Sequence, residues 1–385
     1  MKQKSGGTTT EDQNEPTEIV IGYNADQSVG ATKSFGVWGR QGFEVAVDEI
    51  NASGGILGKK IKAVILDDKA DKEISKKNME QLIFQDKALA VVGPANSANA
   101  LYWLDLAQEN ETIIISHVAT ATEITTKYAE RPRNYIFGIR TLDKDQIRLF
   151  VAWAIRKTNN GKIAIIYDST AYGTQGLKDV TEVMARWGKT PVFTKSFDKG
   201  ISVEDLTKII ESAKTAGADA IISYTYADSN ADVLKATDKV KNYNPVLVGT
   251  AANIAGLWQL AGPLASKLIF AAPVGAEFNE NTKILNQKII DKYGQAPFLL
   301  SSAASGYDAV YFLKTAIEKA GTTDKVAVRD AMETIGSFTG TMRVFVKPYS
   351  KQNHEFLTPR DSFLSQWVDG KIVILDEDIS NLEIR

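Results

Sequence analysis

Short apolar runs with β-branched residues alternate with amphipathic helical patterns from Glu18 onward, and this alternation constrains the fold more than any other feature. The run Glu18–Tyr23 has the character of a buried strand, and the helical pattern Gly36–Ala52 ends at a Ser-Gly-Gly signal. A strand, a helix and a second strand in this order form a right-handed crossover between parallel neighbours. The alternation therefore predicts an α/β fold with parallel sheets covered by helices on both faces.

The alternation of strand and helix patterns forms two successive series, and the second series starts after Thr141. A length of 385 residues agrees with two domains. The C-terminal part differs, because the strand patterns Leu364–Val368 and Lys371–Leu375 are joined by Asp-Gly, a hairpin signal. These patterns predict two doubly wound lobes, with a hairpin near the end of the chain.

Composition excludes several classes of function. The net charge of −2 gives no support for binding nucleic acid, and no stretch approaches the roughly 20 apolar residues that span a bilayer. The chain has no cysteine, and its two histidines, His117 and His354, are far apart, so we expect no metal and no histidine-based catalysis. No GxGxxG follows the first strand and no GxSxG occurs, so we expect no cofactor and no enzyme.

Small polar residues follow two of the predicted strands. Asn96 and Ser97 come after the strand Leu89–Val92, and His117 and Thr120 come after the strand Thr112–Ser116. Ligands of open α/β sheets bind at the carboxyl ends of the strands, and a helix start offers free N–H groups to a carboxylate. Serine and threonine at these places also serve as simple helix caps, so each loop alone leaves both interpretations open.

Aromatic residues follow strand ends in both halves of the chain. Phe35 and Trp38 come after the first strand, and Tyr172 and Tyr226 come after two strands of the second half. Tyrosine is amphipathic and common in pockets, although core packing explains any one of these rings as well. Their shared position at strand ends favours a binding site between two lobes.

The chain resembles the leucine/isoleucine/valine-binding branch of the type I periplasmic binding proteins, which serve ABC importers. The most specific matches are DEINASGGILG within residues 42–61 and YDSTAYG within residues 163–173. Other matching segments are ILDDKAD, VVGPANSAN, ATATEIT, YIFGIRTLDKDQ and GADAIISYTYAD. They occur in the family's order and, with the later helices, cover most of residues 18–374.

The resemblance implies two lobes joined by a three-crossing hinge, which close around a ligand. It implies lobe 1 from residues 18–140 plus 274–347, and lobe 2 from residues 141–273 plus 348–385. It also implies ligand contacts by the residues that match the family's site, namely Phe35, Ser97, Val118, Thr120, Tyr172, Tyr226 and Ala251. Trp38, Asn96, His117 and Asp228 are further candidates on the grounds of position alone.

Ala251 departs from the family pattern. Amino-acid-binding members carry an acidic residue there, which pairs with the ligand's ammonium, and a methyl group cannot do so. The departure favours a carboxylate without an amine, such as an aromatic acid or a 2-oxo acid. The alternative is an amino-acid receptor in which Asp228 or Asp26 replaces the missing acid, although both are expected to face solvent.

The expected partners are a small-molecule ligand and the membrane permease of an ABC importer, with the receptor itself a monomer. We expect a periplasmic or other extracytoplasmic location, with residues 1–17 as a disordered tether that suits a lipid anchor. A ligand-sensing regulator of the same fold stays open as an alternative. An α/β hydrolase or transferase is the enzymatic alternative, and it lacks a nucleophile–base pair in the sequence.

Overall fold

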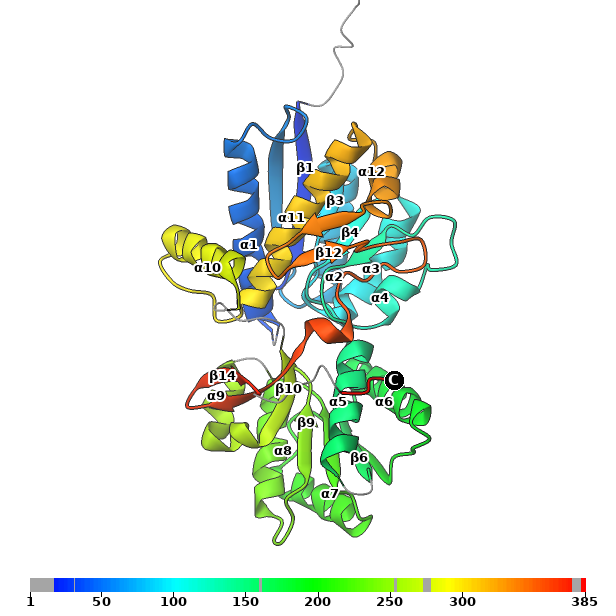
Figure 1. The fold of residues 1–385 in the computed structure, drawn as a ribbon, viewed down its shortest axis with the longest axis vertical. Helices are drawn as coiled ribbons and strands as arrows, with labels where there is room; N and C mark the ends of the chain where they lie inside the picture. Colours follow the sequence, from blue (N-terminus) through cyan, green and yellow to red (C-terminus); the bar gives the residue numbers. More distant parts are fainter. Residues whose placement is uncertain (1–16, 31, 159–160, 253–254, 273–277, 376–381) are drawn as a thin grey trace, which may run out of the picture.

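A computed structural model describes residues 17–30, 32–158, 161–252, 255–272, 278–375 and 382–385. Two lobes are stacked along the long axis of the molecule and meet at a narrow waist (Figure 1). The upper lobe is blue, cyan, yellow and orange, and the lower lobe is green with a red edge, so each is assembled from separate parts of the chain. The expected tether lies almost wholly in residues 1–16, outside the described residues.

Lobe 1 contains a five-stranded parallel sheet. Its strands in spatial order are β2 (Lys60–Asp67), β1 (Glu18–Ala25), β3 (Ala90–Val92), β4 (Ile113–Ser116) and β5 (Ile136–Gly138). Two separate apolar cores pack on this sheet: one includes Ile21 and Phe312, and the other includes Val91 and Trp103. Helices therefore cover both faces, as the alternation predicts.

Lobe 2 contains a seven-stranded mixed sheet. Its order is β14 (Lys371–Ile374), β13 (Phe363–Val368), β10 (Leu268–Ala272), β9 (Val246–Gly249), β8 (Ala220–Tyr224), β6 (Ile163–Asp168) and β7 (Phe193–Phe197). The five strands from β10 to β7 are parallel, and β13 and β14 run antiparallel at one edge. This pair is the predicted C-terminal hairpin. Two cores again flank the sheet.

The helices of lobe 1 are α1 (Lys33–Ala52), α2 (Lys72–Glu80) with a π-helical turn (Gln81–Gln85), α3 (Ser97–Glu109), α4 (Glu123–Thr126), α10 (Glu280–Tyr293), α11 (Leu300–Ala320) and α12 (Lys325–Met332). Those of lobe 2 are α5 (Asp143–Lys157), α6 (Ala171–Arg186), α7 (Val203–Thr215), α8 (Ala227–Lys239) and α9 (Ala255–Ala261), followed by a 3₁₀ turn (Gly262–Lys267). A small hairpin of β11 (Ser337–Thr339) and β12 (Val344–Val346) lies on lobe 1. None of the described helices is long and apolar enough to cross a membrane.

The chain passes between the lobes after β5, after β10 and before β13. The expected change of lobe between residues 347 and 348 is wrong, because the chain stays with lobe 1 for about ten residues more. Tyr349, Phe356 and Leu357 belong to the lobe 1 core, and residues 354–356 run beside β5. The aromatic side chains of Tyr349 and Phe356 are buried in this core. The expected boundary between residues 273 and 274 lies outside the described residues.

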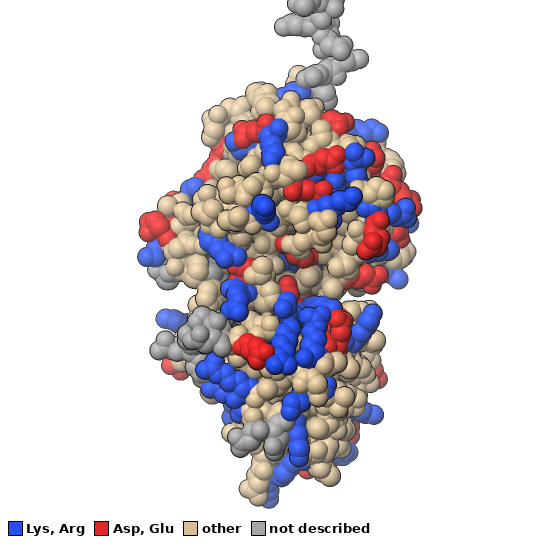
Figure 2. All heavy atoms as spheres, turned by 45° about the vertical axis from the view of Figure 1, so that its right-hand side comes forward, with Lys and Arg blue, Asp and Glu red and all other residues tan. Residues whose placement is uncertain are grey.

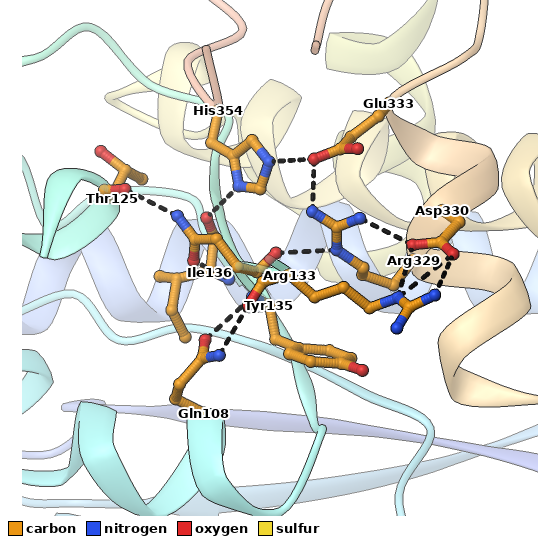
Figure 3. A network of polar contacts seen from close by, with 10 residues as sticks. Gln108, Thr125, Arg133, Tyr135, Ile136, Arg329, Asp330, Glu333 and His354 are labelled. Carbon is orange, nitrogen blue, oxygen red and sulfur yellow. Dashed lines mark hydrogen bonds and ion pairs between the residues drawn. The ribbon is translucent and has the colours of Figure 1, made fainter. Parts of the chain in front are cut away.

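A buried polar network fixes this last segment to lobe 1 (Figure 3). The His354 ring stacks on Phe137, its Nδ1 lies 2.8 Å from the Ile136 carbonyl oxygen, and its Nε2 lies 2.9 Å from Glu333. Arg329 of α12 donates to the Asn134 carbonyl oxygen at 3.0 Å and pairs with Glu333. The network joins α12, the residues before β5 and the segment that precedes the last crossing, so this segment is held to lobe 1 by several contacts at once.

Four aromatic rings form a stack that extends from one lobe to the other. Trp38 of α1 contacts Phe298 at a centroid distance of 5.9 Å, and Phe298 stacks on Trp367 of β13 at 5.6 Å. Trp367 in turn stacks on Trp258 of α9 at 6.2 Å. We name these four rings the aromatic bridge, since Trp38 and Phe298 belong to lobe 1 and Trp367 and Trp258 to lobe 2.

Candidate ligand-binding cleft

A cavity lies at the waist between the lobes. It encloses about 1010 Å³ of space, part of which is open to solvent. Its wall includes these residues predicted from sequence: Phe35, Asn96, Ser97, His117, Val118, Thr120, Tyr172, Tyr226 and Ala251. The carboxyl ends of strands from both sheets therefore meet at one cavity, which is where open α/β sheets bind ligands.

The start of α3 forms part of the lobe 1 wall. Asn96 caps the helix, because its side chain accepts hydrogen bonds from the N–H groups of Ala98 at 2.9 Å and Asn99 at 3.3 Å. The Ser97 hydroxyl oxygen accepts a hydrogen bond from the Ala121 N–H at 3.3 Å, which leaves its proton for another acceptor. Asn96 is thus the cap, and the half-buried Ser97 keeps a donor for the cavity.

His117 follows β4 and has one ring nitrogen engaged. The Tyr23 hydroxyl donates to the Gly36 carbonyl oxygen at 2.6 Å, so the contact of 2.9 Å between Tyr23 and His117 Nε2 requires the proton on the histidine nitrogen. Burial lowers the pKa of His117 to about 3, which keeps the ring neutral. Nδ1 is then an acceptor, and it has no hydrogen-bond partner among the described residues.

Stacked tyrosines form the lobe 2 wall. Tyr226 precedes α8, Tyr172 lies in the first turn of α6, and their ring centroids are 4.8 Å apart. Tyr172 also packs against the fully buried Tyr224, again at 4.8 Å. Gly176 makes room for this stack, because a Cβ at that position would lie 2.2 Å from the Tyr224 ring. Aromatic rings therefore form the cavity wall on this side.

Ala251 lines the cavity from the loop after β9, as its place in the sequence predicts. Its φ of 47° lies in the left-handed region, where residues with a Cβ are uncommon. The next residue, Ala252, is held by a hydrogen bond of 2.7 Å from the Trp367 indole to its carbonyl oxygen. The aromatic bridge thus supports the loop that carries Ala251.

Trp38 and Asp228 do not line the cavity, which differs from the expectation for these two candidates. The Trp38 ring is part of the aromatic bridge. Asp228 is 43% exposed and pairs with Lys199 at 3.0 Å, so the position of its carboxylate is explained by a surface ion pair. The expectation that Asp26 faces solvent is wrong: it is fully buried, and it accepts a hydrogen bond from Thr32, which lines the cavity while Asp26 itself does not.

Two charged residues of the first crossing line the cavity, and the sequence patterns did not single them out. Arg140 is 4% exposed, pairs with the buried Glu355 and donates from Nε to the Ala119 carbonyl oxygen at 2.6 Å. Asp143 is 3% exposed and begins α5. The sequence Arg-Thr-Leu-Asp between a strand and a helix has no residue pattern that distinguishes a ligand-binding segment from an ordinary loop.

A row of serines at the start of α11 was also missed. Ser301, Ser302 and Ser305 line the cavity together with Met342. Gly306 explains the position of α11, since a Cβ there would lie 2.1 Å from the Gly39 carbonyl oxygen, so α11 and α1 pack closely. The spacing of these serines on one helix face was the available signal, but the same spacing fits a solvent-exposed face.

Comparison with known proteins agrees with this architecture. Residues 18–371 match the family model described as periplasmic binding protein. The chain is 27% identical over 364 residues to a Leu/Ile/Val-binding protein homolog 3 of Brucella melitensis, covering 93% of this chain and 94% of that one. It is 25% identical over 318 residues to a leucine-, isoleucine-, valine-, threonine-, and alanine-binding protein of Pseudomonas aeruginosa, covering 79% of each.

Solved structures show the same fold. A type 1 periplasmic binding protein from Bordetella pertussis superposes with a TM-score of 0.81 at 25% identity, covering 93% of this chain and 99% of that one. LivJ of Streptococcus pneumoniae, solved in complex with isoleucine, gives a TM-score of 0.75 at 24% identity, covering 92% and 97%. Proteins of this kind bind small molecules outside the cytoplasm and work with ABC permeases. Since the family model matches nearly the whole chain, the protein belongs to the periplasmic binding protein family.

Proposed function

We propose that this protein captures a small organic carboxylate between its two lobes and presents it to the permease of an ABC importer. The observation that carries the proposal is the shared cavity wall: a helix start and two small polar loops from lobe 1 face stacked tyrosines from lobe 2. A ligand that contacts both walls stabilises the closed arrangement of the lobes, which is how hinge proteins trap a ligand.

The carboxylate is assigned to the lobe 1 wall. The start of α3 carries the partial positive charge of a helix N-terminus, and Ser97 holds a hydroxyl proton that no described residue accepts. Thr120 lies on the neighbouring loop and lines the same cavity. Phe35, Tyr172 and Tyr226 supply flat apolar surface for the rest of the molecule.

Ala251, taken alone, favours a ligand without an amine, such as an aromatic acid or a 2-oxo acid. The relatives named for leucine, isoleucine and valine favour an amino acid instead. Asp228 gives little support to the relocated-acid alternative, because Lys199 already neutralises it at the surface. Whether the ligand carries an amine therefore depends on whether another acidic residue near the cavity can pair with it.

Lysine and arginine side chains gather on lobe 2 directly below the waist in the face shown in Figure 2. The lobe 1 surface in the same view carries acidic and basic groups intermixed. A permease must contact both lobes to recognise the closed receptor, and a charged rim at the waist suits such a contact.

Replacing Ser97 with alanine is expected to weaken ligand binding by about tenfold to a hundredfold, because a hydrogen bond to a charged group contributes roughly 1.5–3 kcal/mol. Isothermal titration calorimetry with a ligand identified by native mass spectrometry of the purified protein measures the change. Ser202→Ala is the matched control, since Ser202 also lies at a helix start and accepts a hydrogen bond from the Asp205 N–H at 3.0 Å, but it does not line the cavity. Equal affinity of Ser97→Ala and the parent would show that this hydroxyl only holds the Ala121 N–H of the neighbouring loop.

A further inference from the structure

We propose that Asp143 binds a cationic nitrogen placed next to the ligand's carboxylate, so that the ligand is an α-amino acid or an N-alkylated relative of one. The inference rests on the proposed function and names its ligand class. It also changes the expectation from Ala251, because it finds the missing acid on the first crossing rather than in the loop after β9.

Asp143 has the burial of a site residue. It is the first residue of α5, where an acid commonly interacts with the helix dipole, and such acids are usually exposed. Here the residue is 3% exposed and lines the cavity. No ion pair between its carboxylate and a cation occurs among the described residues. Interaction with the helix dipole does not require the acid to be buried in the wall of a cleft, so it does not by itself explain the position of Asp143.

The backbone puts Asp143 beside the carboxylate-binding loop. Its N–H donates to the Thr120 carbonyl oxygen at 2.9 Å, so the acid and the loop at Thr120 are direct neighbours. An α-amino acid carries its ammonium one carbon away from its carboxylate. Adjacent anion-binding and cation-binding groups match that spacing, and they do not match an amine at the far end of a long chain.

The surroundings of Asp143 are acidic on balance. Arg140 of the same crossing is a cation that acts on Asp143; its Nη1 is paired with the buried Glu355, and its Nη2 has no hydrogen-bond partner among the described residues. Asp179 of α6 is a further acid near Asp143, and it accepts hydrogen bonds from Gln175 and Thr122 rather than pairing with a cation. A carboxylate without an amine would add negative charge to this wall, whereas a zwitterion adds a cation where one is lacking.

Two further features of the cavity suit a cation. The rings of Tyr172 and Tyr226 line the cavity, and aromatic rings attract ammonium groups. His117 contributes a neutral acceptor, because its Nδ1 has no hydrogen-bond partner among the described residues.

Burial raises the pKa of Asp143 to about 6, although the hydroxyl groups of Thr120 and Tyr224 oppose this. The acid is therefore mainly ionised at neutral pH, and a bound ammonium would keep it so.

The test is calorimetry with matched pairs of probes: leucine against 4-methyl-2-oxopentanoate, and phenylalanine against phenylpyruvate. We expect the amino acid of at least one pair to bind more tightly than its oxo partner, and Asp143→Asn to weaken the amino acid by about a hundredfold. The oxo partner should be unaffected by the substitution, or gain affinity. Asp145→Asn is the matched control, because Asp145 lies on the same helix, pairs with Arg148 at 3.3 Å and does not line the cavity.

Tighter binding of the oxo acids, or an amine preference that survives Asp143→Asn, overturns the inference. A preference lost in Asp26→Asn but kept in Asp143→Asn also overturns it, since the ammonium would then lie at the other buried acid. Thermal unfolding without ligand shows whether each variant folds. Native mass spectrometry separates the two proposals: a co-purified carboxylic acid without basic nitrogen contradicts only this inference, and a co-purified ligand without any carboxylate contradicts the proposed function as well.

Discussion

Replacing Arg140 with methionine is expected to lower the free energy of unfolding by about 3–5 kcal/mol, because it leaves Glu355 buried without its cation. Both side chains are less than 10% exposed, at 4% and 9%, so Glu355 has little access to water. Burial already raises the pKa of Glu355 to about 7, and Arg140 opposes that rise. Without Arg140 the pKa should rise further, and uptake of a proton limits the cost at acidic pH.

Urea denaturation at pH 8 and at pH 5.5 measures this effect, with the larger loss expected at pH 8. Arg133→Met is the matched control, since Arg133 pairs with Asp330 at 3.2 Å but is 50% exposed, and exposed pairs contribute about 0–1 kcal/mol. The double change Arg140→Met with Glu355→Leu should recover much of the loss. A single Arg140→Met variant as stable as the control at pH 8 would contradict the account of a buried charge.

The second large effect concerns Asp308 of α11, whose carboxylate accepts hydrogen bonds from the Thr341 N–H at 3.0 Å and the Thr341 hydroxyl at 2.9 Å. Burial raises the pKa of Asp308 from 3.8 to about 7. The folded protein therefore binds this proton more tightly than the unfolded chain does. The resulting stability is full below about pH 4 and is lost as pH rises through 7, on the order of 4 kcal/mol.

Asp308→Asn is expected to flatten the fall in stability between pH 5 and pH 8. At pH 8 the variant should be more stable than the parent, because an amide stays neutral and Thr341 can reverse its hydroxyl hydrogen bond. Denaturant melts at several pH values test this. Asp105→Asn serves as the control, since the Tyr128 hydroxyl lowers the pKa of Asp105 and its titration lies below this range. A parent protein whose stability rises from pH 5 to pH 8 would exclude the proposed role of Asp308.

The fold was largely predictable from sequence because the spacing of apolar residues is a local property, and each stretch of regular spacing corresponds to one helix or strand. The predicted helix Gly36–Ala52 is α1, and the predicted strand Leu268–Ala272 is β10. Strand ends are also local features, so the residues placed there, such as Ser97 and Tyr226, line the cavity together. A doubly wound sheet brings these ends to one edge whatever the details of the loops.

The site residues and the lobe boundary that the sequence did not predict depend on contacts between residues far apart in the chain. Such contacts leave no regular spacing in the sequence. Glu355 lies 215 positions from Arg140, and no local pattern links them. Asp143 at a helix start reads as an ordinary helix-starting acid until its burial is known. The segment around Phe356 fits either lobe by composition, and its assignment to lobe 1 follows from packing against Phe312 and Tyr349. The role of Trp38 likewise depends on Phe298, which lies far away in sequence.

The aromatic bridge gives the protein a built-in optical signal. Tryptophan emission depends on the environment of the indole, and Trp258 and Trp367 stack closely enough for their electronic transitions to couple in near-ultraviolet circular dichroism. Phe298 is the exposed link between the lobes, at 38% exposure, so rotation of one lobe against the other changes the surroundings of the indoles on either side of it. Lobe movement can therefore be followed in real time without an attached dye, and a stopped-flow trace would separate the encounter with ligand from the closure that follows.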